Sequence, residues 1–272
     1  WDDNMGYSFH KYWGQTDIST IQSYINLRNN YGVPLWMGES GENSNHWYYE
    51  VFKLLEENNI GWNFWTHKKV DKITSPYSAL VTPQYQVIID YLRGVGGQPD
   101  PNIAGMGLTS FANSLKIENC ITRPGVIASL TDPEYGEISK PYTTHSIPGT
   151  IPAAYYDIGA RGLSYSDSDY WNDGDGGYND GWVFRNDGVD VEGSDDDPNI
   201  PYTVGWTEAG EWLGYTIEDV LPGTYDVSFS ISAPDAGGIF YAQLSGQNLG
   251  VIDVPSTGGW YSWEDIPSQR IE

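Results

Sequence analysis

The sequence predicts a multidomain protein, in which an α/β region is followed by an antiparallel β-sandwich. In the first part, short apolar runs alternate with segments of helical period, which is typical of a parallel sheet. From residue 151 onward, short strand-like runs are separated by Gly, Asp and Pro turns, the spacing of a sandwich. The charge changes at the same place: residues 1–150 carry 15 acidic and 10 basic side chains, whereas residues 151–272 carry 22 and 3.

The elements of the first part follow in order. In the first strand, Ser8, His10 and Tyr12 alternate with apolar residues and should share one face. Three strand–helix repeats predict parallel strands joined by right-handed crossovers, but three units cannot close a barrel, which needs eight. We expect strands at residues 5–13, 33–37 and 60–66, helices at 17–29, 44–59 and 85–92, and one or two further helices within 104–130.

The second part is separated from the first by a segment without clear periodicity. Residues 132–150 are rich in Pro, Gly, Ser and Thr, so we expect a linker between a domain at 1–131 and a sandwich at 151–272. Among the sandwich aromatics, we expect Trp206 and Trp212 in the core.

Composition limits the classes of partner. The net charge of −24 leaves nothing basic to neutralise phosphates, so we expect no nucleic acid partner. No apolar run reaches the length that spans a bilayer, so we expect no membrane partner. Twelve Trp and 21 Tyr exceed what a core needs, and exposed flat rings are suited to gripping sugars. Carbohydrate is therefore the candidate ligand, while the oligomeric state remains unpredicted.

The segment PLWMGESGEN, residues 34–43, contains the leading candidate for chemistry. Its apolar run predicts a fully buried strand, and Glu39 follows at the carboxyl end of that strand. This is where β/α barrels keep their catalytic groups. The alternative for Glu39 is an ion-pair partner or a helix-cap acceptor, since Ser44 is a plausible N-cap.

Three motifs in the expected order resemble the last three βα units of a family 5 glycoside hydrolase. They are HKYW at residues 10–13, GESGEN at 38–43 and GWNFWTHK at 61–68. The resemblance implies part of a TIM (β/α)8 barrel and a retaining hydrolase of β-linked polysaccharide, such as cellulose or a related β-glucan. It also implies a secreted, extracellular protein.

The same resemblance implies roles for four residues. Glu39 matches the family's nucleophile, His10 and Tyr12 match its His-x-Tyr pair, and Trp65 matches the aromatic that floors the subsite beside the cleaved bond. Tyr12 is placed to donate a hydrogen bond to Glu39 from the neighbouring strand. From the strand pattern alone, His10 could instead be a core histidine and Trp65 could be barrel packing.

Retaining hydrolysis needs a second carboxyl group, which protonates the leaving oxygen. The family carries it in an Asn-Glu-Pro motif, and that triplet does not occur in this sequence. We therefore expect the chain to be inactive by itself, and the alternative function is a non-catalytic carbohydrate-binding protein. No cofactor is expected for catalysis.

Residues 151–272 resemble a family 6 carbohydrate-binding module. The resemblance implies that Phe184 and Trp260 grip a sugar between them, with Phe184 standing where a Tyr is usual. Structural calcium is an option in this part, but Ala154 stands where the family places a glutamate. An Asp/Gly-rich loop suggests a second calcium candidate, although a solvated turn accounts for it as well; its acidic residues are Asp173, Asp175 and Asp180. The motifs are IPAAYYDIG, FRNDGVDVE, VGWTEAGEWLGYT, PGTYDVSFSIS and VPSTGGWYSW.

Overall fold

The computed structural model of the chain describes residues 2, 4–174 and 177–271. Its contacts divide the chain into two compact units, residues 1–144 with 151–216 and residues 145–150 with 217–272. This division groups the start of the expected sandwich with the first unit, and the predicted domain boundaries stay a prediction. Within the described ranges, no helix combines the length and apolarity that crossing a membrane requires.

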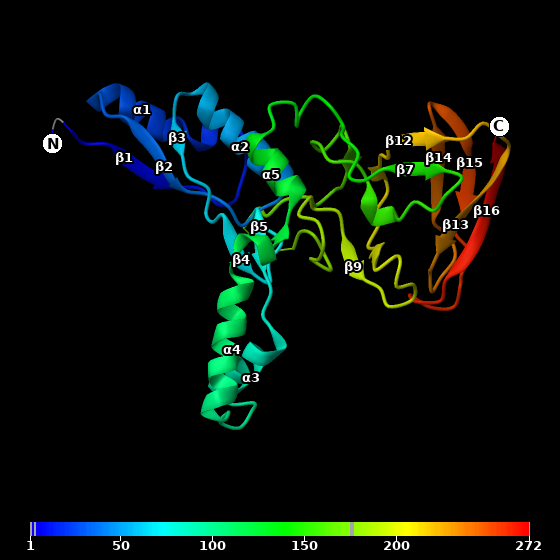
Figure 1. Cartoon of the computed structure of the whole chain (residues 1–272). Helices are drawn as coiled ribbons and strands as arrows, with labels where there is room; N and C mark the ends of the chain where they lie inside the picture. The colour runs from blue at the N-terminus through cyan, green and yellow to red at the C-terminus, as the bar shows by residue number, and fades with distance from the viewer. Residues whose placement is uncertain (1, 3, 175–176, 272) are drawn as a thin grey trace. The chain divides into compact units, whose positions relative to one another are not determined.

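The first unit opens with a parallel sheet in the order β1-β2-β3 (Figure 1). Helices α1 and α2 pack on one face, as the alternating pattern predicts, and Ser44 caps α2 by accepting the backbone N–H of Trp47. The core between these layers includes Phe9, Met37 and Leu55. The bounds are β1 Tyr7–His10, η1 Ile18–Thr20, α1 Gln22–Tyr31, β2 Leu35–Glu39, α2 Asn45–Glu57 and β3 Gly61–Trp62.

The prediction that the strand at residues 33–37 is fully buried is wrong, because Pro34 and Trp36 are exposed. Trp36 is 43% exposed, and its ring covers Gly61 on the neighbouring strand. Ser8 and His10 on the same face of the sheet are also exposed. The helices cover only one face of these three strands. Successive residues along each strand therefore alternate between the buried face and the exposed face. Among the described residues there are three neighbouring parallel strands and no closed barrel.

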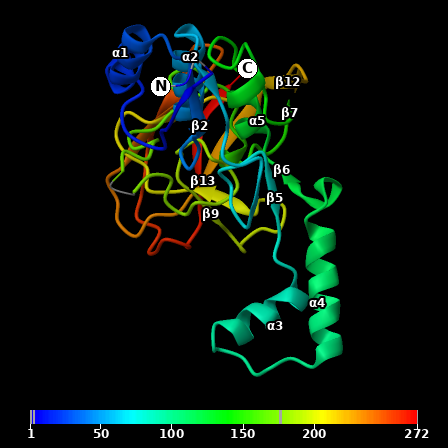
Figure 2. The ribbon, with the colours of Figure 1, turned by 90° about the vertical axis from the view of Figure 1, so that its left-hand side faces the viewer.

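A second small sheet, in the order β4-β5-β6, follows β3 and leads to a pair of helices. Figure 2 shows α3 and α4 side by side, apart from the rest of the first unit. Tyr85 and Phe111 stack between them with ring centroids 4.2 Å apart. Gly107 allows the close approach, since a Cβ there would lie 2.5 Å from the Gln84 carbonyl oxygen. The bounds are β4 Lys68–Val70, β5 Tyr77–Ala79, α3 Pro83–Leu92, α4 Pro101–Ser114, η2 Ile117–Asn119, β6 Ile121–Thr122 and α5 Pro124–Thr131.

Residues 151–216 complete the first unit with short two-stranded ladders. A second core gathers Tyr156, Tyr165 and Val191 there. The prediction that Trp206 and Trp212 are core residues is wrong, because they are 50% and 42% exposed. The ladders are too short to build two facing layers over these rings. Strand β8 pairs with β11 and β9 pairs with β10, and the bounds are η3 Ala153–Tyr155, β8 Tyr165–Ser166, β9 Val191–Gly193, β10 Tyr202–Val204 and β11 Trp212–Leu213.

The second unit is β-rich, as the turn spacing predicts. The antiparallel pairs β13–β16 and β14–β15 form its longest ladders, and β7 pairs in parallel with β12. Because β7 lies within the expected linker, that segment contributes a strand to this unit. The bounds are β7 His145–Ile147, β12 Ile217–Val220, β13 Tyr225–Ile231, β14 Ile239–Leu244, β15 Gln247–Asp253 and β16 Glu264–Ile271.

Candidate functional site

The carboxyl edge of the parallel sheet brings together the three predicted catalytic residues. The Tyr12 hydroxyl donates a hydrogen bond of 2.6 Å to Glu39 Oε2, as expected. His10 Nδ1 lies 3.5 Å from the same oxygen. The side chains of His10 and Glu39 are 50% and 35% exposed, so solvent and a ligand can reach both. Burial, followed by the hydrogen bond and the charge of Glu39, raises the pKa of Tyr12 well above its usual range. Tyr12 therefore remains a hydrogen-bond donor at neutral pH.

A β-bulge between β1 and β2 sets the orientation of the His10 and Glu39 side chains. The register of β1 against β2 runs from Phe9–Met37 directly to His10–Glu39, which leaves Gly38 as the extra residue. A Cβ at Gly38 would lie 2.6 Å from Ser8 Oγ and 3.2 Å from His10 Nε2. Glycine at this position lets the side chain of His10 lie across the strand next to Glu39, and bulges often re-aim side chains in this way.

The loop after Glu39 is hydrogen-bonded to the backbone of Trp65, the tryptophan predicted to line the subsite. The Trp65 backbone N–H donates to the Ser40 carbonyl oxygen at 2.7 Å. A Cβ at Gly41 would lie 2.1 Å from the Trp65 carbonyl oxygen, so only glycine permits this approach. Trp65 itself is 51% exposed and its ring is available for stacking. Its role at the subsite stays a prediction.

Asn43, which sequence reasoning passed over, connects the Glu39 loop to a distant part of the first unit. Its side-chain amide donates to the backbone oxygens of Tyr12 at 3.0 Å and Asn172 at 2.9 Å. Its Oδ1 accepts the backbone N–H groups of Ser44 and Asn172. The only hint in the sequence is the place of Asn43 within GESGEN, since the partner Asn172 comes from a segment far along the chain.

Glu42 is the next carboxylate along this loop, and it forms an ion pair with Lys69. A general acid must deliver a proton, and an ion pair with lysine suits a charged structural group instead. The cluster at Glu39 therefore combines an accessible carboxylate with a hydrogen-bond donor, its role as a nucleophile stays a prediction, and Glu42 is unsuited to be an acid partner.

The two predicted sugar-binding aromatics lie in different units. Phe184 belongs to the first unit, where it stacks on Tyr202 at 4.2 Å between ring centroids and also contacts Tyr142 and Tyr155. This packing gives Phe184 a structural role in the first unit, whatever its role toward a ligand.

Trp260 belongs to the second unit and is 70% exposed. Its loop is held by Ser232 Oγ donating to the Gly259 carbonyl oxygen at 2.8 Å, and by three hydrogen bonds between Thr257 and Ala233. The unit therefore presents a large flat ring on a fixed loop. The prediction that Phe184 and Trp260 hold one sugar between them stays a prediction.

An acidic group that could hold a cation lies in the first unit. Carboxylate oxygens of Asp167, Asp169 and Glu211 all lie within 4.8 Å of one another. Burial raises the pKa of Asp167 to about 8, and so do the hydrogen bond that its protonated form donates to the Asp169 carboxylate and the charge of Glu211. The sequence suggests instead the loop with Asp173, Asp175 and Asp180, of which Asp175 lies outside the described residues.

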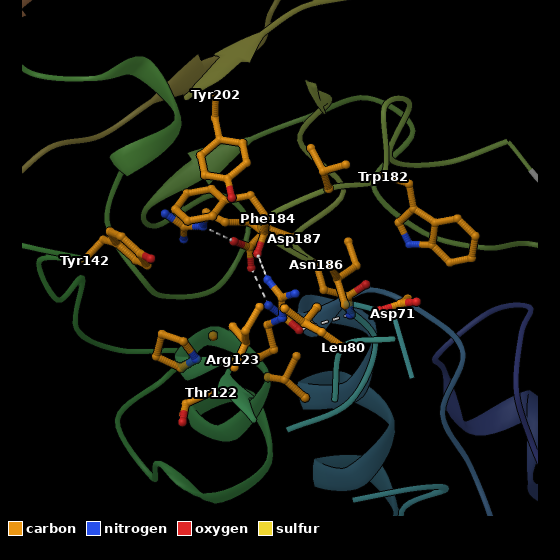
Figure 3. A pocket seen from close by; sticks show the side chains of 18 residues that line it. Asp71, Leu80, Thr122, Arg123, Tyr142, Trp182, Phe184, Asn186, Asp187 and Tyr202 are labelled. Atoms are coloured by element: carbon orange, nitrogen blue, oxygen red, sulfur yellow. Dashed lines mark hydrogen bonds and ion pairs between the residues drawn. The ribbon is translucent and has the colours of Figure 1, made fainter. Parts of the chain in front are cut away.

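The first unit also contains a pocket with a cavity volume of about 410 Å³. Figure 3 shows aromatic side chains on its walls, with Arg123 inside and Asp71 toward the Trp182 side. The pocket shares no lining residue with the Glu39 cluster. Its aromatic residues are Tyr142, Trp182, Phe184 and Tyr202.

Two comparisons with known proteins bear on this chain. A stretch of 60 residues, 21% of the chain, is 37% identical to the clotting factor G alpha subunit of Tachypleus tridentatus, and the match spans 9% of that protein. The profile of carbohydrate-binding module family 35 matches residues 185–271. The family 6 resemblance is corrected by this match, while the carbohydrate-binding character is confirmed. Residues 185–271, which include parts of both compact units, therefore match a carbohydrate-binding module of family 35, and the match indicates carbohydrate binding by this part of the chain.

Proposed function

We propose that the chain combines this module with the nucleophile half of a retaining β-glycosidase site, directed at an extracellular β-glucan. The observation that carries the proposal is the short hydrogen bond from Tyr12 to Glu39 at the carboxyl edge of a parallel sheet, with His10 beside it. Parallel β/α sheets keep catalytic side chains at this edge. The module would hold the protein on polysaccharide and raise the local concentration of bonds that can be cleaved.

In this proposal, the carboxylate of Glu39 attacks the anomeric carbon, and the bond to the leaving oxygen breaks with its electron pair on that oxygen. Tyr12 holds Glu39 oriented by its hydrogen bond, and His10 lies where it can bond the same carboxylate or a sugar hydroxyl. A natural leaving group needs a proton from a second carboxyl group. A very acidic leaving group, such as dinitrophenolate, departs without one.

This difference allows the nucleophile to be tested in the chain as it stands. We expect incubation with a 2,4-dinitrophenyl 2-deoxy-2-fluoro-β-glucoside to add one fluoroglucosyl group to the protein. Intact-protein mass spectrometry should show the added mass, and peptide mapping should place it on Glu39. The Glu39→Gln variant should gain no mass, and Glu42→Gln, its neighbour on the same loop, should be labelled as the wild type is.

The competing function is carbohydrate binding without catalysis, for which the module alone suffices. A wild-type protein that stays unlabelled while it still sediments with insoluble β-glucan would favour that function. Labelling of the Glu39→Gln variant to the wild-type extent would remove Glu39 from the mechanism.

We further infer that the acidic group holds calcium. Carboxylate oxygens are the ligands that this ion prefers, and Asp167, Asp169 and Glu211 supply three in one place. Burial is the main cause of the raised pKa of Asp167, followed by the neighbouring carboxylates, whose repulsion a bound divalent cation would relieve. The ion would have a structural role, because none of these residues belongs to the Glu39 cluster.

A further inference from the structure

Helices α3 and α4 form a hairpin, residues 83–116, that has almost no core of its own. Within these two fully described helices, Gly107 is the one residue that is buried. The helices contact each other through the stacked rings of Tyr85 and Phe111, and Figure 2 shows them apart from the rest of the first unit. Helices in proteins gain most of their stability by packing an apolar face against other elements. The hairpin therefore has packing capacity that its own two helices do not use.

The outer surface of the hairpin is apolar. Leu92 at the end of α3 is 74% exposed, and Met106 in the middle of α4 is 65% exposed. The other large apolar side chains that the hairpin exposes are Val87, Tyr91, Val95, Ile103 and Leu108. Exposed apolar residues that gather on one element, instead of being scattered singly, mark a surface that another molecule covers.

The charge of the hairpin indicates what that molecule is. Residues 83–116 carry two acidic and two basic side chains, which cancel, whereas the whole chain has a net charge of −24. Two copies of so acidic a chain repel each other over most of their surface, and the repulsion is least where each copy is neutral. A second copy can therefore approach this surface more readily than the acidic surfaces of the chain. The charged residues are Asp90, Arg93, Asp100 and Lys116.

Other classes of partner fit the hairpin less well. Helices that lie on a membrane surface are rich in Lys and Arg on their polar face, and the hairpin offers only Arg93 and Lys116. Stacking on sugars needs exposed aromatic rings, and Tyr91 is the one aromatic among the exposed apolar side chains of these described helices. A strongly charged protein would meet no field of opposite sign. A second copy of the chain needs neither cations nor rings, because it brings the same apolar surface.

We propose that two copies of the chain associate through their α3–α4 hairpins, each hairpin covering the apolar surface of the other in a four-helix bundle. A two-fold interface uses the same surface on both copies, which an uncharged apolar hairpin satisfies. Four helices around a shared apolar core are a stable architecture. The proposal is independent of Glu39 and of residues 185–271, all of which lie outside the hairpin, so each can fail alone.

Analytical ultracentrifugation of the full chain tests the proposal by measuring mass against concentration and salt. We expect a monomer–dimer equilibrium, with dimerisation at least about threefold tighter in about 0.5 M than in about 0.05 M sodium chloride. The reason is that salt screens the repulsion between two acidic chains and leaves an apolar contact intact. A protein that stays monomeric over about a hundredfold range of concentration overturns the proposal, and so does a dimer that salt weakens.

Two substitutions on different helices locate the interface. Met106→Glu and Leu92→Glu should each weaken the dimer by at least about tenfold, because two-fold symmetry brings two new carboxylates into an apolar contact. Leu221→Glu, at a 65% exposed apolar position of the second unit, should leave dimerisation unchanged.

Both hairpin positions are mostly exposed, so the single chain should tolerate the changes, and far-UV circular dichroism of dilute protein checks this. Dimerisation at the wild-type level by either folded variant overturns the proposal. Cosedimentation of a monomeric wild type with phosphatidylcholine vesicles also overturns it, in favour of a lipid surface as the occupant.

Discussion

Asn43 and Asn172, 129 residues apart in the chain, exchange two hydrogen bonds of 2.9 Å each. Asn43 is completely buried and also donates to the Tyr12 carbonyl oxygen. The pair therefore joins the end of the first strand, the Glu39 loop and the segment beyond residue 150 within one unit. Asn186 reinforces the joint, since its amide donates to the Asn43 carbonyl oxygen at 2.7 Å.

Replacing Asn43 by Ala should lower the free energy of unfolding by about 2–4 kcal/mol, because several buried polar groups lose their partners at once. Urea unfolding followed by fluorescence measures the change. Asn30→Ala, at an exposed position of α1, is the matched control and should change stability by less than about 0.5 kcal/mol. A similar decrease in the free energy of unfolding in the two variants would mean that the hydrogen bonds of Asn43 contribute little to stability.

Replacing Gly41 by Ala should destabilise the Glu39 loop, because the new methyl group would occupy the space of the Trp65 carbonyl oxygen. We expect a loss of about 1–3 kcal/mol, as for other overpacked sites. Gly97→Ala is the control, since nothing lies within 4 Å of a Cβ at that position. Thermal melting compares the two variants, and an unchanged melting temperature in Gly41→Ala would contradict the close approach.

The two predicted sugar-binding aromatics should respond differently to truncation. Trp260→Ala should leave stability nearly unchanged, because the ring is 70% exposed, yet weaken sedimentation with insoluble β-glucan by about tenfold. Phe184→Ala should cost about 2 kcal/mol of stability, because it removes a partly buried ring that stacks on Tyr202. Leu221→Ala, at a 65% exposed apolar position, is the control for binding. Undiminished glucan binding by Trp260→Ala would exclude that ring from the binding surface.

Calcium at about one hundred times its dissociation constant should raise the melting temperature by about 5–10 °C, because the ion binds only the folded acidic group. Asp167→Asn should abolish this response, whereas Asp195→Asn, an exposed position, should retain it. Differential scanning calorimetry with and without a chelator measures both. A calcium effect that survives in Asp167→Asn would place the ion elsewhere.

In the calcium-free protein, replacing Asp167 by Asn should increase stability at high pH. The pKa of this carboxyl is about 8 when folded, above its ordinary value, so the wild type should lose stability as pH rises from about 4 toward 8. The amide of Asp167→Asn does not titrate. The variant should therefore be the more stable protein at pH 8, and greater wild-type stability there would contradict the raised pKa.

The contact between Tyr12 and Glu39 could be predicted from the sequence, because both follow short apolar strands that parallel pairing brings side by side. The cap at Ser44 was predictable for a similar reason, since it depends on neighbours a few residues away. Local patterns contain the information for both features.

Features that depend on long-range pairing could not be predicted in this way. Nothing near Asn43 in the sequence points to Asn172, and Glu211 of the acidic group lies more than 40 residues from Asp167, so no local motif marks that group. The exposure of Trp36 depends on how many layers cover the sheet, which the strand's own apolar run does not reveal.

The loop around Trp260 has an implication for how the protein meets a solid surface. Because Ser232 and Thr257 hold the loop before any glycan arrives, the indole has little freedom left to lose on contact. Encounter with a crystalline or tangled fibre then requires no refolding step. If Trp260→Ala weakens glucan binding as predicted, the ring would release one sugar and take the next along the fibre at a similar energy, and the protein would remain adsorbed while its position on the fibre changes.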